Sequence, residues 1–348
     1  MKTNNSIGEL NYIFKDNIDD DIWNAFVLQH PNGNIFQTIE MYNVYKNTKK
    51  YKPLKLCVTD KDTGNIHGLL SSVTINEYSG ILSRFSSRSI VQGGPLIGDN
   101  ENTNIILPLI MDKYDGELKN KALYSQVRNL FDTNSGLKQI EKYKFEDHLN
   151  FIINLDRKEE DVWGDIHKDR RKNINRSMNR GVTIEEVTDR TLIPVFYKLL
   201  QETYNNVKIP LADISLIYSA FDILVPKEMA TFFLAKYQEK YIGARVVLTY
   251  KDMIYDWYAG AANDSLSLYP NEHLVWHILK WGRDRNFKKF DFGGAGKPDV
   301  PYGPREFKRR FGGELVNYGW YECVYSPVTA YLILNIFNIY HKFSTARS

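Results

Sequence analysis

Two stretches of the sequence concentrate residue types that could bind an anion or hold a reacting group. The first, residues 168–182, carries six basic side chains and a single acid, a local excess of five positive charges. Ile174 and Met178 lie four residues apart, so one face of a helix could pack while the basic side chains cover the rest, and Gly181 suits the helix end. Arginine binds phosphate through paired hydrogen bonds. The stretch therefore predicts a helix that anchors a phosphate-bearing ligand, and the alternative is a solvated basic face.

The second stretch, residues 290–315, reads FDFGGAGKPDVPYGPREFKRRFGGEL. Two glycine pairs bracket a basic and aromatic segment, 307–311. Glycine allows the backbone to approach a ligand closely, but the pattern is neither a dinucleotide-binding fingerprint nor a P-loop. On residue chemistry alone, the stretch fits a glycine-containing loop as well as it fits a binding site.

Four other side chains could take part in chemistry. Asp256 on an expected strand and Asp291 beside the glycines could handle a proton, or they could close hydrogen bonds at strand ends. His273 and His277 have a spacing that can bind a metal on a helix, yet no third ligand accompanies them, so we expect a structural role and no metal site. No nucleophile motif is present, and the sequence gives no support to a covalent intermediate.

The elements that must position these residues follow one plan in both halves of the chain. In the second half, β-rich runs at 231–237, 242–250 and 253–261 predict an antiparallel meander, and a helix from Pro270 to about 286 and a strand at 289–292 follow. The first half shows the same order, with its expected elements at 20–29, 38–47, 54–59, 66–75 and 105–120. Helices, a meander, a helix and a strand are typical of an N-acetyltransferase-type half, whereas a Rossmann unit alternates strand and helix throughout.

Length and composition agree with two globular domains. The chain has 348 residues, 43% hydrophobic and 25% charged, and we place the domains at 1–156 and 157–348. The formal net charge of +3 is too small to indicate a general polyanion binder, so an anion site must come from a local cluster. Cys57 and Cys323 form no CxxC pair and are expected to be packed thiols.

Targeting signals are not evident, and we expect a cytoplasmic protein. The N-terminus lacks the basic and apolar pattern of a secretory signal, and no run of about 18 apolar residues is present. Residues 328–340 are apolar on most sides. We expect them to form a helix packed on the body, with peripheral membrane contact as the alternative.

Three segments in order resemble the Fem family of bacterial peptidoglycan-bridge aminoacyl transferases and the FemAB-like acetyltransferases. They are IFQTIEMYNVYK (35–46), RRKNINRSMNRGV (170–182), and FDFGG (290–294) followed by FKRRFGGELV (307–316). The resemblance implies an α/β (α+β) protein of two tandem GNAT-like domains, each a mixed, mostly antiparallel sheet flanked by helices. It also implies a substrate groove at or between the domains and transfer of an acyl group to an amine.

Site residues carry over from the resemblance by motif. The family's Phe-Lys pair at the reaction centre corresponds to Phe307 and Lys308. An early Lys that holds substrate phosphates corresponds to Lys46, and a second phosphate-binding residue corresponds to Arg171 or Arg176. The sequence departs from part of the family in lacking a charged heptad insertion that would form a coiled-coil arm.

The resemblance leaves the acyl donor open between aminoacyl-tRNA and acyl-CoA, with no bound cofactor in either case. Acetyl-CoA enzymes usually carry a glycine-rich pyrophosphate loop after the fourth strand, and residues 259–265 lack that pattern, which weakens CoA use. Three functions compete. They are aminoacyl transfer to a cell-wall precursor, CoA-dependent N-acylation of an amino sugar in glycan assembly, and non-catalytic nucleic-acid binding through the basic helix.

Overall fold

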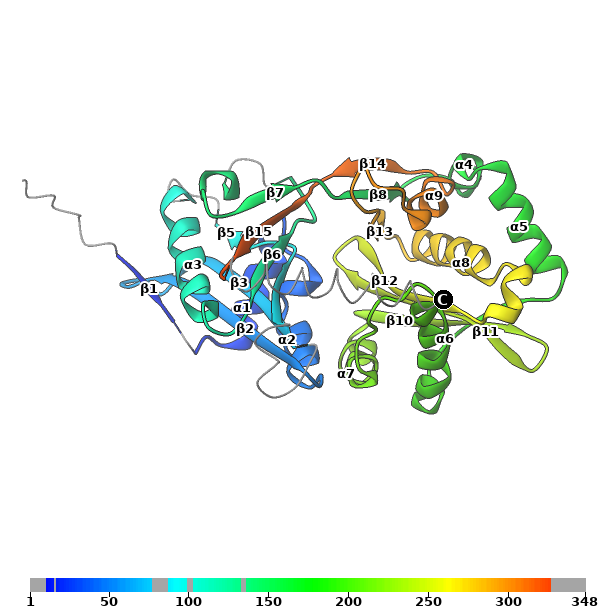
Figure 1. The fold of residues 1–348 in the computed structure, drawn as a ribbon, viewed down its shortest axis with the longest axis horizontal. Coiled ribbons are helices and arrows are strands. Elements are labelled where there is room, and N and C mark those ends of the chain that lie inside the picture. The colour runs from blue at the N-terminus through cyan, green and yellow to red at the C-terminus, as the bar shows by residue number, and fades with distance from the viewer. Residues whose placement is uncertain (1–10, 16, 77–86, 99–102, 133–135, 327–348) are drawn as a thin grey trace, which may run out of the picture. The chain divides into compact units, whose positions relative to one another are not determined.

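A computed structural model describes residues 11–15, 17–76, 87–98, 103–132 and 136–326. These residues form two compact units. The first takes its described residues from 11–42, 50–145 and 321–326, and the second from 43–49 and 146–320. Each unit is built around its own β-sheet with flanking helices (Figure 1), so the predicted fold class is confirmed.

The first sheet belongs to the N-terminal part of the chain. Its strands are β1 (Tyr12–Phe14), β2 (Tyr51–Asp60), β3 (Ile66–Asn76), β4 (Ser87–Gln92), β5 (Leu96–Ile97), β6 (Tyr124–Arg128), β7 (Lys144–Glu146) and β15 (Trp320–Val324). They run in the order β1-β2-β3-β4-β6-β15-β7, and β5 pairs with β3. The helices are α1 (Asp20–Gln29), α2 (Ile39–Lys46) and α3 (Thr103–Leu118).

Local chemistry explains why the first-unit elements begin and end where they do. The Asp19 carboxylate accepts hydrogen bonds from the first backbone amides of α1 and caps the helix. Between β2 and β3, the Asp60 carboxylate accepts from the amides of Asp62 and Thr63, and Gly64 adopts a φ of 73°, which favours glycine. The predicted hairpin is therefore present, and β2 and β3 pair in antiparallel register.

Gln37, in the FQ segment quoted above, connects two parts of the first unit. Its buried side-chain amide donates to the carbonyls of Gly93 and Gly94, at 2.9 and 2.7 Å, and its Oε1 accepts from the amide of Asn34. Gly93 has a φ of 81° and Gly94 a φ of 72°. Gln37 thus fixes a glycine turn that lies more than fifty residues away in sequence.

The second sheet repeats the plan of the first. Its strands are β8 (Leu149–Asn154), β9 (Thr183–Glu186), β10 (Ala230–Tyr237), β11 (Lys240–Tyr250), β12 (Met253–Ala261), β13 (Lys289–Gly294) and β14 (Glu314–Asn317). They run in the order β14-β8-β13-β12-β11-β10-β9. The helices are α4 (Glu159–Asp165), α5 (Lys168–Asn179), α6 (Ile193–Asn206), α7 (Ile214–Leu224), α8 (Pro270–Asp284) and α9 (Gly303–Arg309).

Consecutive residues of β10 show how the helices cover both faces of this sheet. Successive side chains of a strand point to opposite faces. Phe232 packs against Phe196 of α6 and Phe221 of α7, whereas Phe233 packs against Trp281 of α8. Helix α8 therefore covers one face and α6 and α7 cover the other, as Figure 1 shows.

The chain divides differently from the boundary expected at residue 156. Strand β8, which precedes that boundary, pairs with β13 and β14 of the second sheet. Strand β15, near the end of the described chain, lies between β6 and β7 in the first sheet. The second unit therefore includes β8, which lies before residue 156, and the first unit is completed by β15 from near the end of the described chain.

Cys57 and Cys323 are free and buried, as expected for packed thiols. Burial raises the pKa of the Cys57 thiol to about 12 and that of Cys323 to about 11. None of the described helices is both long enough and apolar enough to span a bilayer. The helix expected at 328–340 lies outside the described residues.

Candidate functional site

The site begins where two neighbouring parallel strands stop pairing. β12 and β13 pair in parallel over Met253–Tyr255 and Lys289–Asp291. One residue further along β12, the register between β11 and β12 shifts at a bulge. The end of β13 then runs through Gly293, which has a φ of 70° and therefore a conformation that favours glycine. The short helix α9 brings Lys308 to this end of β13.

Lys308 is the centre of the site. Its Nζ donates to the carbonyl oxygens of Phe292, Gly293 and Gly294, at 2.6, 3.3 and 2.8 Å. Three acceptors for three N–H groups make this a well-defined ammonium position. Burial lowers the pKa of Lys308 to about 8, against the opposing influence of Asp256 and Asp291. The structure thus brings together three residues that the sequence singled out separately.

Asp291 interacts electrostatically with this ammonium group and is 2% exposed. Its Oδ1 accepts from Asn150 Nδ2 at 2.7 Å and from the Gly293 amide at 2.6 Å. Burial raises the pKa of Asp291, although both hydrogen bonds oppose that shift. These contacts fix the turn at the end of β13, so the carboxylate performs the strand-end role that the sequence allowed.

Asp256 forms a buried ion pair with Arg245 of β11. The distance from Arg245 Nη1 to Asp256 Oδ2 is 2.6 Å, and the two side chains are 5% and 10% exposed. Arg245 Nε and Asp256 Oδ1 are buried without a hydrogen-bond partner among the described residues. Sequence reasoning missed Arg245. The available signal was a lone arginine inside an apolar strand, which needs a carboxylate because an unpaired buried charge is costly.

Phe307 is held between the core and a cation. Its ring packs against Phe311, with centroids 5.1 Å apart, and the guanidinium of Arg170 lies over it at 4.5 Å. Arg170 also donates to Glu272 of α8 at 2.5 Å. Phe307 therefore joins α9 to the basic helix, which the sequence treated as a separate feature.

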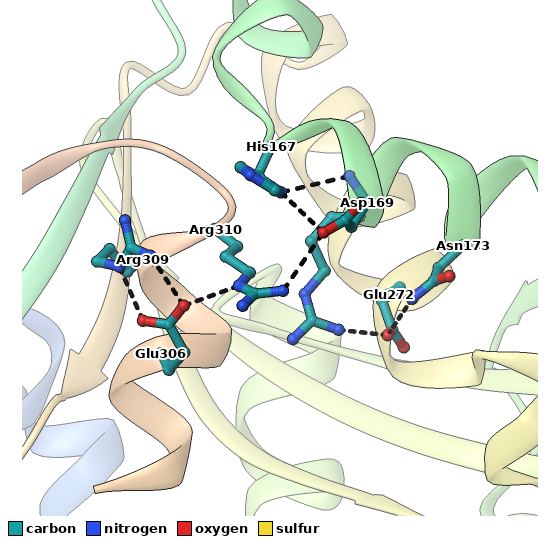
Figure 2. A network of polar contacts seen from close by, with 8 residues as sticks. His167, Asp169, Asn173, Glu272, Glu306, Arg309 and Arg310 are labelled. Carbon is teal, nitrogen blue, oxygen red and sulfur yellow. Dashed lines mark hydrogen bonds and ion pairs between the residues drawn. The ribbon is translucent and has the colours of Figure 1, made fainter. Parts of the chain in front are cut away.

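A polar network surrounds this junction, and Figure 2 shows it from close by. Glu306 binds both Arg309 and Arg310, and these two cations lower its pKa to about 2. Arg310 also pairs with Asp169 of α5 at 3.7 Å. The carboxylates of Glu306 and Asp169 thus bind different nitrogens of the Arg310 guanidinium, and together they hold the end of α9.

Helix α5 confirms the predicted basic helix and divides its cations into two groups. Arg170 and Arg180 turn back onto the protein, because Arg180 donates to the Ser267 carbonyl at 2.7 Å and lies over Tyr269. The remaining four have no ion pair or hydrogen bond from their side chains among the described residues: Lys168, Arg171, Lys172 and Arg176. The candidates Arg171 and Arg176 both belong to this unpaired group.

Lys46 ends α2 and is exposed. Within the described chain, no hydrogen bond or ion pair joins it to Lys308 or to α5. The assignment of Lys46 to a substrate phosphate stays a prediction from the resemblance.

The two histidines of α8 lie against packed neighbours. His273 is 3.4 Å from the hydroxyl of the buried Ser177, and burial lowers the pKa of His273 to about 4. His277 meets Phe233 edge to face. The described part of the chain holds no cluster of three or more His, Cys, Asp or Glu side chains that could bind a metal. These contacts fit the structural role expected for both histidines.

Comparison with known proteins places this geometry in a known fold. Residues 168–309 match the family model described as an acetyltransferase (GNAT) domain. That segment runs from the first residue of α5 to the last residue of α9, and it therefore includes Lys308, Asp256 and Arg245. A sequence search of curated proteins found no significant match.

Three solved structures are similar over most of their length. FemX has 16% sequence identity and a TM-score of 0.68, covering 90% of this chain and 97% of its own. L-PGS from Bacillus licheniformis has 15% identity and a TM-score of 0.56, covering 90% and 96%. A tandem GNAT protein from the clavulanic acid biosynthesis pathway has 10% identity and a TM-score of 0.57, covering 91% and 98%. At these identities the likeness shows the fold, and it confirms the predicted pair of GNAT-like domains and the Fem-like architecture.

Proposed function

We propose that this protein is an acyltransferase that moves an activated acyl or aminoacyl group onto an amine of a cell-wall or glycan precursor. One observation carries the proposal: a partly desolvated ammonium group, Lys308, sits where two parallel strands part in a GNAT fold. The match of 168–309 to an acetyltransferase domain and the fold shared with FemX support it.

The proposed reaction is aminolysis of an ester or thioester. The amine nitrogen attacks the donor carbonyl carbon, the bond from that carbon to the leaving oxygen or sulfur breaks, and the nitrogen gives up a proton. The positive charge of Lys308 stabilises the negative charge that develops on the carbonyl oxygen or the leaving group. A pKa of about 8 leaves Lys308 mostly protonated at neutral pH. It can give the leaving group a proton when one of its three N–H groups leaves its carbonyl acceptor. Because the donor is already activated, positioning and electrostatics supply the acceleration without a protein nucleophile.

Asp256 and Asp291 have different parts in this proposal. Asp291 already accepts two hydrogen bonds that shape the β13 turn, so it sets the position of the Lys308 acceptors. Asp256 has one buried oxygen without a partner among the described residues, and it is the better candidate to handle the proton of the amine. Phe307 contributes by packing beside Lys308 on α9.

The unpaired cations of α5 are the proposed phosphate site. Lys168, Lys172 and Arg176 recur every four residues, so they follow one face of the helix at intervals of about 6 Å. Arg171 lies beside them, and Lys46 stays a further candidate. Phosphates occur in a nucleotide-linked acceptor, in CoA and in tRNA, so this face suits the substrates of either transfer reaction.

Two donors remain in the proposal, aminoacyl-tRNA and acyl-CoA, with no resident cofactor. We place the reaction in the cytoplasm, where both donors and the precursors of cell-wall and glycan assembly occur. For a lipid-linked acceptor, the proposal also includes contact of residues 328–340 with a membrane surface. A separate function is non-catalytic nucleic-acid binding. Only the unpaired cations of α5 favour it.

Parallel transfer assays test the proposal. The purified protein is offered labelled aminoacyl-tRNA or labelled acetyl-CoA, each with a pool of nucleotide-linked cell-wall precursors and amino sugars. Label that moves to an amine in the wild type, and not in Lys308→Met, supports the proposal and identifies the donor. Lys289→Met is the matched control, because Lys289 is an exposed lysine at the start of β13, the strand whose other end carries the acceptors of Lys308. Nucleic-acid binding with no label transferred from either donor would favour the non-catalytic alternative.

A further inference from the structure

Among the described residues, Arg170 is the cation of α5 whose side chain pairs with a carboxylate of another helix. Its side chain is 17% exposed, and its Nη1 lies 2.5 Å from Glu272 Oε1. The Glu272 side chain is 10% exposed and also accepts from Asn173 of α5. The guanidinium is therefore held by Glu272 of α8 while its Cζ lies over the Phe307 ring, 4.5 Å from the centroid. Figure 2 shows Glu272 joined to Asn173 by a dashed line.

Helix α9 depends on such contacts for its position. It has seven residues, and a helix this short is marginal without tertiary packing. Phe307 inserts between Arg170 and Phe311, and Arg310 pairs with Asp169. Asp169 and Arg170 are neighbours in the first turn of α5, so one turn of that helix holds α9 at two points.

We propose that Arg170 is a positioning residue for Lys308: by covering the Phe307 ring and pairing with Glu272, it fixes α9 so that the Lys308 ammonium lies on the carbonyl end of β13. The importance of that position for transfer rests on the proposed function. Lysine cannot replace Arg170, because a compact ammonium group pairs with Glu272 but lacks the planar face that covers the ring.

Two variants remove the interaction in different ways. Arg170→Lys keeps a cation beside Glu272 and loses the planar contact. The double variant Arg170→Leu/Glu272→Gln removes the ion pair without leaving a buried carboxylate unpaired, and its thermal unfolding shows whether it folds. Arg180→Leu is the matched control, since Arg180 covers Tyr269 at the opposite end of the same helix.

The first readout needs no enzymatic activity. Lys308 is acylated with an amine-selective reagent across a pH series, and its modification is followed by peptide mass spectrometry. In the wild type and in Arg180→Leu, the rate should rise with a midpoint near pH 8. In both Arg170 variants the midpoint should move upward toward the ordinary lysine value, because Lys308 leaves its desolvated position. An unchanged midpoint in both folded variants overturns the inference.

The second readout is transfer kinetics. A misplacement of about 1 Å can cost about a hundredfold in rate, so both Arg170 variants should lose kcat with little change in KM. Adding Arg170→Lys to Lys308→Met should cause no further loss, because the two changes remove one effect. A shifted labelling midpoint in the Arg170 variants, combined with a wild type that transfers no acyl group, would reject the proposed function and keep the positioning role. Normal kcat in both Arg170 variants, with an active wild type, would reject the positioning role alone.

Discussion

Lys308 of α9 donates a hydrogen bond of 2.6 Å to the carbonyl oxygen of Phe292, a residue of β13 that lies 16 positions earlier in the chain. This contact places a cation at the open end of a pair of parallel strands, close to two carboxylates. The charge is desolvated enough to lower its pKa and still has a full set of acceptors. Its consequences for stability, binding and catalysis can be measured separately.

The lowered pKa of Lys308 predicts how stability depends on pH. Folding moves this pKa from the ordinary lysine value of 10.5 to about 8, so between these two values the unfolded chain binds more protons than the folded chain. The free energy of unfolding should therefore gain a Lys308-dependent increment as pH rises from 8 to 10.5, and below pH 8 that increment should be absent. Urea unfolding of the wild type and Lys308→Met at several pH values measures the difference. A difference that does not vary over this range would contradict the assignment.

Removing only one partner of the ion pair between Arg245 and Asp256 should lower the free energy of unfolding more than removing both. Arg245→Met leaves a buried carboxylate unpaired and should lower the free energy of unfolding by about 3–5 kcal/mol. The double variant Arg245→Met/Asp256→Leu should recover a large part of this loss, because no charge is left alone. Chemical denaturation checks both values.

The exposed pair Arg190–Asp222 in the same unit is the control for this prediction. Its closest N–O distance is also 2.6 Å, but its side chains are 56% and 44% exposed. Arg190→Met should cost at most about 1 kcal/mol. If Arg245→Met and Arg190→Met lost equal free energies of unfolding, burial would not explain the loss at Arg245.

Gln37 should stabilise the first unit through its buried amide. Gln37→Leu removes the donors to the Gly93 and Gly94 carbonyls and the acceptor for the Asn34 amide. Leaving buried polar groups without partners costs about 1–3 kcal/mol for each group. We expect a fall in thermal unfolding temperature. A variant as stable as the wild type would show that water or a rearranged turn replaces these bonds.

The unpaired face of α5 should bind phosphate electrostatically. Lys172→Glu and Arg176→Glu should each weaken binding of inorganic pyrophosphate or single-stranded RNA. For RNA, the magnitude of the slope of log K against log salt concentration should fall by about 0.7 for each lost phosphate contact. Titration calorimetry and salt-dependent RNA binding provide the measurements. Arg283→Glu is the control on another helix, and an equal effect there would indicate a nonspecific charge response.

The sequence predicted the elements well where local pattern determines them. The hairpin of β2 and β3, the meander of β10 to β12 and helix α5 all follow from alternation, turn residues and a helix-ending glycine. It did not predict that β8 belongs to the second sheet or that β15 returns to the first sheet. Such strands are short and apolar, and their partners are set by long-range packing that no local signal records.

The candidate site was predicted in part. Lys308, Asp256 and Asp291 were selected individually, and the structure places them in one cluster. Their partners Arg245 and Asn150 were missed, because each lies in an ordinary strand pattern and becomes significant only through a contact across the sheet. The same is true of Glu272, which resembles any acidic residue in the first turn of a helix until Arg170 is seen beside it.

The rate of a single turnover tests the central claim most directly. The wild type, Lys308→Met and the control Lys289→Met are mixed in excess with whichever labelled donor is used, together with the amine acceptor, at neutral pH. We predict loss of a factor of about 10²–10³ in the rate of label transfer for Lys308→Met, comparable to removing one oxyanion-stabilising donor, and a normal rate for Lys289→Met. Unchanged transfer by a folded Lys308→Met would contradict the proposed role of Lys308 and, with it, this account of the site.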